Sequence, residues 1–250
     1  MLRRWTESVV VELGLDAVRA RRRSWRGRVV AAAGRSHAAA EDAIAAAGVS
    51  FDAVLGEVLA GQPGRSRSLD VILDNAWTCI DVVAGRFGGM TKAQIQRIAR
   101  GCVDEIAPDH EVQWQLQRGA ATLLIAAMPR ALLVPLGEAA RRHGLDLRSV
   151  TPRVVWCWNG ARERLGGDDV VFACMAQGFV ACLHARRGVV EATAQAAVPD
   201  GDAAAAALDL QFDRLLALRG LPQSAARRFV VMGALGAGSP RWDVVQEDAS

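Results

Sequence analysis

Few side chains in this sequence could carry out covalent or acid–base chemistry. Lys92 is the single lysine in a chain of 250 residues, 30 of which are Lys or Arg, and there is no tyrosine. Any mechanism that needs a lysine nucleophile or a phosphate-binding lysine therefore depends on Lys92. Because Lys92 follows Thr91 at the expected start of a helix, we interpret it as a solvated surface residue. A tyrosine acid is excluded.

The cysteines and histidines form no recognisable metal or disulfide pattern. The five cysteines are an odd set without a Cys-x-x-Cys pair, and four lie in apolar runs, where a reduced thiol behaves as a small hydrophobic side chain. The histidines show no metal-ligand spacing. Strand alternation places Cys182 and His184 on one face, as a nucleophile and a base would be, but the sequence shows no acid to orient His184. His143 precedes Gly144 at a helix end, where a cation favours the helix dipole.

The densest positive charge surrounds Trp25. The six arginines of this cluster are Arg19, Arg21, Arg22, Arg23, Arg26 and Arg28. A basic patch with an aromatic residue can bind single-stranded nucleic acid or acidic lipid. The alternative, which we favour, is a solvated hairpin in a protein that uses arginine in place of lysine throughout. The formal net charge of +3 does not by itself indicate a nucleic-acid partner.

Length and composition indicate a folded protein with a sizeable core. The chain is 51% hydrophobic, and its length suits one large domain or two small ones. The N-terminus lacks the pattern of a secretory signal. The most apolar segment, residues 119–137, contains two prolines and an arginine, so it is interpreted as a buried strand followed by a helix, not as a membrane span. A reducing cytoplasm is the expected location.

Hydrophobic periodicity and turn residues predict an alternation of strands and helices. Strands are expected at residues 8–13, 17–23, 28–33, 111–117, 121–127, 145–150, 170–175, 179–185, 189–193 and 228–232. Helices are expected at residues 36–47, 51–60, 91–106, 129–142, 152–165 and 201–218. Segments 69–73 and 77–83 are expected to pair as a hairpin around Asp74 and Asn75. Gly144 is expected to close the helix at 129–142.

An order of three strands followed by a helix occurs twice, which suggests two related halves. The first half is expected at residues 1–150, with an inserted hairpin–helix unit at about 66–128, and the second at residues 151–250. The predicted fold class is α/β, with mixed sheets and helices. Two strand meanders of this kind resemble the actin-like (ASKHA, ribonuclease H-like) ATPase fold.

A narrower resemblance covers residues 69–165. The segments 71–77 (VILDNAW), 127–133 (AMPRALL) and 140–152 (ARRHGLDLRSVTP), followed by Trp158 and Asn159, are similar to the cytoplasmic actin-like proteins of type IV pilus and type II secretion assembly platforms, the PilM and GspL families. Residues 9–20 also resemble the first phosphate hairpin of that family. Because no segment predicts a membrane span, a separate PilM-like protein is expected; the cytoplasmic part of a longer GspL-like chain stays an alternative.

The resemblance implies a nucleotide site that has lost its charged and hydroxyl groups. Glu12 and Gly14 match the first phosphate hairpin, but Leu15 and Asp16 stand where small hydroxyl residues would be expected. The second hairpin, which ends at Gly178, has no carboxylate, serine or threonine. The glycine-rich segment containing Gly233 and Gly236 resembles the adenosine loop. Since such loops bind phosphate through backbone N–H groups and Mg²⁺ through an acid, no catalytic residue, metal or cofactor is expected, ATP being the one cofactor considered.

The resemblance therefore implies a non-catalytic scaffold of an inner-membrane assembly platform. Its expected partner is the cytoplasmic tail of a membrane-embedded pilus or secretion protein, with the motor ATPase as a further partner and a homo-oligomer left open. It would be cytoplasmic and peripheral to the inner membrane through its partners. Two alternatives remain: an ATP-binding actin-like ATPase or small-molecule kinase, and an arginine-rich nucleic-acid-binding protein.

Overall fold

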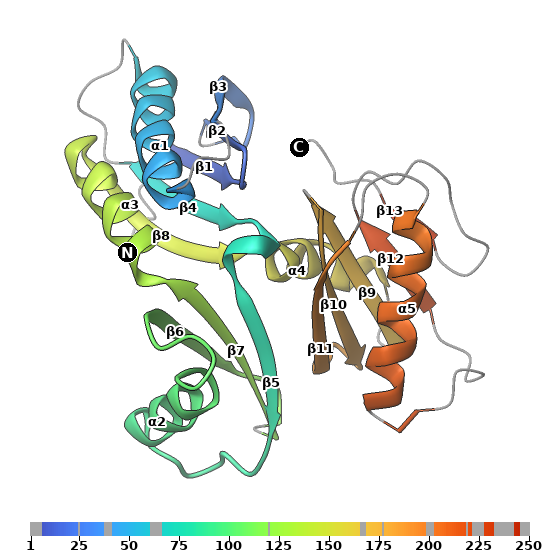
Figure 1. Cartoon of the computed structure of the whole chain (residues 1–250). Coiled ribbons are helices and arrows are strands. Elements are labelled where there is room, and N and C mark those ends of the chain that lie inside the picture. The colour runs from blue at the N-terminus through green and yellow to red at the C-terminus, as the bar shows by residue number, and fades with distance from the viewer. Residues whose placement is uncertain are drawn as a thin grey trace. The chain divides into compact units, whose positions relative to one another are not determined.

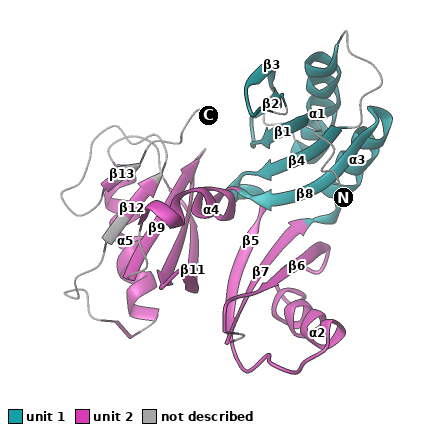
Figure 2. Cartoon of the chain, turned by 180° about the vertical axis from the view of Figure 1, so that it is seen from behind, with its two compact units in different colours: residues 1–77, 129–152, 249–250 teal, residues 78–128, 153–248 magenta. Residues whose placement is uncertain are grey.

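The chain forms two compact units, which a computed structural model describes at residues 7–24, 26–37, 42–60, 67–119, 121–165, 169–176, 178–198, 203–218, 220–221, 228–232 and 243–245. Unit 1 contains Met1–Trp77 and Pro129–Pro152, and unit 2 contains Thr78–Met128 and Arg153–Asp248 (Figure 2). Contacts thus group the segment at 78–128 with the C-terminal part of the chain. The division into halves at residue 150, which was drawn along the sequence, stays a prediction.

Unit 1 is built on a five-stranded sheet of order β3-β2-β1-β4-β8 (Figure 1). Its strands are β1 (Ser8–Leu13), β2 (Ala17–Arg23), β3 (Val29–Ser36), β4 (Arg67–Leu73) and β8 (Leu145–Pro152). The first three strands form an antiparallel meander, as predicted, whereas β4 runs parallel to both β1 and β8. Helices α1 (Ala43–Leu59) and α3 (Arg130–Arg142) contact each other and the sheet.

The two helices predicted at 36–47 and 51–60 are wrong, because the structure has the single helix α1 there. Ser50 is typical of an N-cap and suggested the start of a second helix, but it is buried in the middle of α1. The N-cap is Asp42, whose Oδ1 accepts the N–H of Ala45 at 2.9 Å. The buried face that contains Phe51 and Val54 continues through Gly48, so tertiary packing overrides the local helix propensity.

The predicted hairpin around Asp74 and Asn75 is also wrong. Strand β4 pairs with β1 and β8, and β5 (Cys79–Ala84) pairs with β7 (Thr122–Pro129). A short 3₁₀ helix, η1 (Asn75–Trp77), lies between β4 and β5. A strand in the middle of a parallel arrangement takes partners from distant sequence, and no local turn signal reveals them.

An ion pair in unit 1, of which only the carboxylate is buried, joins β4 to β8. The carboxylate of Asp70, whose side chain is 4% exposed, accepts two bonds from the guanidinium of Arg148, whose side chain is 63% exposed. The Nε of Arg148 donates to Oδ1 at 2.9 Å, and the hydroxyl of Ser149 donates to the same oxygen at 2.5 Å. The charge of Asp70 raises the pKa of Arg148 through the hydrogen bond first and the Coulomb attraction second. Arg148 therefore stays charged at any ordinary pH.

Unit 2 begins with a three-stranded sheet of order β5-β7-β6, covered by α2 (Lys92–Val103). Strand β6 (His110–Leu116) follows the predicted alternation. Thr91 and Gln94 form a capping box at the start of α2, which confirms the predicted helix start, and Lys92 is exposed as expected. No helix among the described residues is long and apolar enough to cross a membrane.

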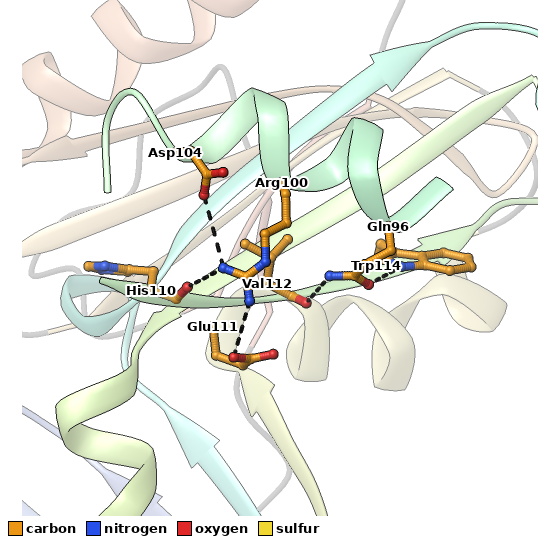
Figure 3. A network of polar contacts seen from close by, with 7 residues as sticks. All are labelled: Gln96, Arg100, Asp104, His110, Glu111, Val112 and Trp114. Atoms are coloured by element: carbon orange, nitrogen blue, oxygen red, sulfur yellow. Dashed lines mark hydrogen bonds and ion pairs between the residues drawn. The ribbon is translucent and has the colours of Figure 1, made fainter. Parts of the chain in front are cut away.

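Polar contacts fix α2 across β6 (Figure 3). The Nε1 of Trp114 donates to Gln96 at 2.6 Å, and the amide of Gln96 donates to the carbonyl of Val112 at 3.3 Å. One turn further along, Arg100 donates to the carbonyl of His110 at 3.3 Å and to Glu111 at 3.4 Å. Each helix side chain thus bonds to the strand beneath it, and this holds the register of α2 on the sheet.

The rest of unit 2 is a five-stranded sheet of order β11-β10-β9-β12-β13 between two helices. Its elements are α4 (Arg153–Leu165), β9 (Asp169–Ala176), β10 (Phe179–Arg186), β11 (Val189–Ala197), α5 (Ala203–Leu218), β12 (Arg228–Met232) and β13 (Asp243–Val245). The core of α4 includes Phe172 and Cys174, whereas the core of α5 includes Val171 and Ala173. Because successive side chains of a strand point to opposite faces of the sheet, α4 packs on one face and α5 on the other. Strand β13 was not predicted.

Candidate functional site

The first predicted phosphate hairpin uses its polar groups internally. Glu12 on β1 forms an ion pair with Arg21 on β2, at 3.7 Å. The N–H of Gly14 donates to the carbonyl of Ala17 at 2.8 Å and closes the turn. The carbonyl of Asp16 accepts the N–H of His37 at 2.7 Å. The structure thus brings Glu12 and Gly14 to one hairpin, where a carboxylate and an N–H group that would face a nucleotide already have partners.

The second predicted hairpin, in unit 2, has a structural reason for its glycine. Gly178 lies in the β9–β10 turn with a φ of +75°, a conformation that glycine adopts without strain. Its carbonyl accepts the N–H of Val198 at 2.7 Å. Gly233 and Gly236 lie outside the described residues, so the third element stays a prediction. The described part of the chain contains no group of three or more His, Cys, Asp or Glu residues that could hold a metal ion.

The acid that could orient His184 is present, although the sequence did not reveal it. The Nε2 of His184, which is fully buried, lies 2.6 Å from Oδ1 of Asp169 on the neighbouring strand. Pairing Asp169 with Arg186 in the antiparallel register would have indicated this proximity. Burial raises the pKa of the Cys182 thiol to about 12, and the side chain is inaccessible. A reactive thiolate is therefore unavailable, and the group is structural.

His143 ends α3 and links it to α1. Its Nε2 lies 3.1 Å from Oδ1 of Asp52, and the guanidinium of Arg142 donates to the same oxygen at 3.0 Å. Burial alone would raise the pKa of Asp52, but the hydrogen bonds and charges of these two residues together hold it below 3.8. Gly144 follows with a φ of +65°, which confirms the predicted C-terminal glycine.

The arginine cluster does not form one continuous surface. Strand β2 alternates, so the side chain of Arg22 is buried on the face that carries Val18 and Ala20. Arg21 pairs with Glu12, and Trp25 lies outside the described residues. The hairpin β2–β3 is the antiparallel pair expected of the favoured interpretation.

Two grooves on the described surface could accept a ligand. In unit 1, a groove of about 620 Å³ lies between α1 and α3, with Val49 and Pro135 as apolar lining and Asp42 and Glu138 as acids. The helices approach closely there, since a Cβ at Gly48 would lie in van der Waals contact with Cβ of Pro135, at 3.4 Å. We call it the α1–α3 groove.

In unit 2, a groove of about 470 Å³ lies between α4, the end of β6 and the β10–β11 turn. We call it the α4 groove. Its apolar lining residues are Leu116, Leu124, Val155, Trp158, Val189 and Val190. Three arginines also line it, namely Arg118, Arg162 and Arg187. A volume of this size lies within the range typical of small-ligand and peptide-anchor pockets.

Side chains hold the elements around the α4 groove together. The amide of Gln117 donates to the carbonyl of Val190 at 2.6 Å and accepts its N–H at 2.8 Å. Gln195 of β11 makes a similar pair of bonds with the edge of β5, accepting from Ile80 at 2.7 Å and donating to Thr78 at 2.9 Å. These bonds join the three-stranded sheet to the five-stranded sheet within unit 2. No sequence pattern had pointed to this groove.

Comparison with known proteins shows the class of fold. No protein-family model matches the sequence, and a search of curated proteins finds no match. Among solved structures, a Bacteroides thetaiotaomicron protein with actin-like ATPase fold and unknown function has a TM-score of 0.62 at 8% identity, covering 92% of this chain and 83% of that one. The chain thus has the actin-like ATPase fold, as its sequence predicts.

Two further structures belong to the assembly systems that the sequence resembles. The cytoplasmic domain of EpsL, an inner-membrane component of the type II secretion system of Vibrio cholerae, has a TM-score of 0.57 at 14% identity, covering 98% of this chain and 87% of that one. A PilM–PilN type IV pilus biogenesis complex contains a chain with a TM-score of 0.58 at 12% identity, covering 90% of this chain and 81% of that one. At these identities the likeness is one of fold.

Proposed function

We propose that this protein is a non-catalytic scaffold of a type IV pilus or type II secretion assembly platform. It binds the cytoplasmic tail of a membrane-embedded component and so lies, in the cytoplasm, at the inner face of the inner membrane. Contact with the motor ATPase is part of the same proposal. The shared fold supports it, because PilM was solved in complex with PilN and EpsL is an inner-membrane component of its system.

The observation that carries the non-catalytic part is the first hairpin turn. Its carboxylate is paired within the hairpin, and the N–H of Gly14 closes the turn. A working phosphate loop directs free N–H groups toward the anion and an acid toward the metal. We interpret Glu12, Gly14 and Gly178, together with Gly233 and Gly236, as the remains of a nucleotide site. The two-half division at residue 150 belongs to this interpretation.

Affinity purification from detergent-solubilised inner membranes tests the partner. We expect mass spectrometry to find a pilus or secretion component with a cytoplasmic tail, and a synthetic peptide of that tail to bind in isothermal titration calorimetry. Retention of no such component would contradict the scaffold. Titration with Mg-ATP is the companion experiment: micromolar affinity or measurable turnover would favour the ATPase or kinase alternative instead.

A further inference from the structure

We propose that the α4 groove docks a short acidic peptide segment that inserts one or two apolar side chains. The inference deepens the proposed function, since it rests on the occupant being a segment of a partner protein. It names a surface and a partner chemistry. The argument has three parts: the floor of the groove, the charge of its rim, and an unusual residue in the turn that borders it.

The floor of the groove offers apolar surface that a partner can cover. Val155, Trp158, Asn159 and Arg162 follow one another at the spacing of a single helix face, so α4 presents one stripe to the groove. Trp158 is 4% exposed, and Val155 is half-buried. An aliphatic or aromatic side chain fits such a floor, and its burial would provide the anchor of the interaction. Trp158 is too deeply buried to stack on a nucleic-acid base.

The rim of the groove carries unbalanced positive charge. We call Arg118, Arg162 and Arg187 the rim arginines; all three are exposed, and within the described chain none has an ion-pair partner. Among the described residues that line the groove, Glu163 is the one acid. Guanidinium groups bind carboxylates through two parallel hydrogen bonds. The lining therefore complements a segment rich in Asp and Glu.

The turn that presents Arg187 is the independent sign that this side chain has a use. Arg187 and Gly188 form the two-residue β10–β11 loop with φ values of +52° and +75°. Positive φ at both positions is the pattern of a type I′ turn, in which Asn, Asp or Gly is strongly preferred at the first. Within the described chain Arg187 is the one residue other than glycine with positive φ. An arginine here costs backbone strain, and we take this strain as a sign that the guanidinium has a use at the rim.

The bonds of Gln117 keep the groove formed before a partner arrives. They tie the end of β6 to Val190, directly beyond the turn, so two of the rim arginines lie on connected segments. A preformed rim loses little freedom on binding, which favours affinity. Charge would also speed the encounter, so the affinity should fall as salt increases.

Selection from a phage-displayed library of short random peptides tests the proposal on the full chain. We expect the enriched peptides to be acidic and to contain Leu, Ile, Phe or Trp. One variant carries Glu in place of all three rim arginines. The matched control carries the same charge change at Arg86, Arg97 and Arg214, exposed residues of unit 2 outside the groove. An enriched peptide should lose at least about tenfold in affinity for the rim variant and little for the control.

Arg187→Asn sharpens the experiment, because it separates binding from folding. Asparagine suits the first position of the turn, so the variant should be at least as stable as the wild type and yet bind the peptide more weakly. Val155→Trp should fill the floor and weaken binding while all rim arginines remain. Enrichment of neutral or basic peptides, absence of enrichment, or equal binding by the rim variant would overturn the proposal.

Three outcomes distinguish this proposal from other partners of the groove and from the proposed scaffold function. Binding of single-stranded DNA or of anionic vesicles that is lost in the rim variant, without acidic-peptide binding, would assign the groove to another partner and overturn it. If the wild type and the rim variant captured a pilus or secretion component equally well, the proposed scaffold function would be supported. The proposal that the α4 groove is the docking site would then be refuted. If acidic peptides bound but no pilus or secretion component were captured, the scaffold function would be refuted and the α4 groove would be supported as a peptide-docking site.

Discussion

The ion pair between Asp70 and Arg148 should respond very differently to removal of its two members. Asp70 is buried, whereas most of the Arg148 side chain faces solvent. In Arg148→Ala the carboxylate keeps only the hydroxyl of Ser149 and remains buried without a counter-charge. Removal of the counter-charge of a buried ion typically costs about 3–5 kcal/mol. The remaining hydrogen bond from Ser149 offsets about 1 kcal/mol of this cost. We expect a loss of about 2–4 kcal/mol in the free energy of unfolding.

Asp70→Ala should cost less, although it removes the buried member. The guanidinium that it leaves is exposed and becomes hydrated, so the loss is that of a few hydrogen bonds, about 1–2 kcal/mol. The double variant should resemble Asp70→Ala, because no buried charge remains in it. The double-mutant cycle should therefore give a coupling of about 2–4 kcal/mol, the full cost of Arg148→Ala.

Urea unfolding followed by circular dichroism measures all three variants. The midpoint should shift while the slope stays constant, since the change in exposed surface is the same. Arg141→Ala is the matched control, as Arg141 is an exposed arginine of α3, and it should change stability by less than about 0.5 kcal/mol. If Asp70→Ala proved as costly as Arg148→Ala or more so, the reasoning from burial would be refuted.

Four further predictions concern local features. Thr91→Ala removes the capping box of α2 and should cost about 1 kcal/mol in urea unfolding, with faster amide exchange in the first turn; an unchanged midpoint would contradict the cap. Gly144→Ala should cost about 1 kcal/mol because of its positive φ, whereas Gly137→Ala, inside α3 and facing open space, should gain about 0.5–1 kcal/mol; equal signs would refute the distinction. Asp52 has a lowered pKa in the folded state, so its ion pairs stabilise the protein above pH 3.8, and this stabilisation is lost as the pH falls through the lowered pKa. The difference in the free energy of unfolding between the wild type and Asp52→Asn should therefore shrink in that pH window. A difference that stays constant with pH would argue against these ion pairs. Cys182 should resist iodoacetamide in the native protein and react in urea, as peptide mass spectrometry would show; native labelling would disprove its burial.

The sequence predicted those elements whose signals are local. The helix α2 was found from Thr91 and its apolar face, and the meander β9–β10–β11 from runs of apolar residues separated by glycine turns. Gly144 revealed the end of α3. Caps and turns depend on residues within one turn of each other, so composition at a few positions is sufficient.

The candidate sites were less accessible to sequence reasoning. Resemblance pointed to Glu12 and Gly14, but only the structure shows that Glu12 pairs with Arg21 and that the N–H of Gly14 closes its own turn. The arginine cluster looked continuous in sequence, yet strand alternation buries Arg22. Asp169 lies within hydrogen-bond distance of His184 because the neighbouring strands β9 and β10 pair. Each of these contacts depends on which residues lie opposite one another on neighbouring strands. The register of strand pairing determines this, and the sequence does not show it.

By itself, the sequence determined an α/β protein of two strand meanders with helices, one lysine and no tyrosine, because periodicity and composition are properties of the chain alone. Only the tertiary structure decided that β4 inserts between β1 and β8, and that β6, α4 and the β10–β11 turn meet around one groove. Parallel pairing and convergent surfaces join residues far apart in sequence. Their free energy comes from packing and desolvation across those distances, and no local pattern of residues encodes it.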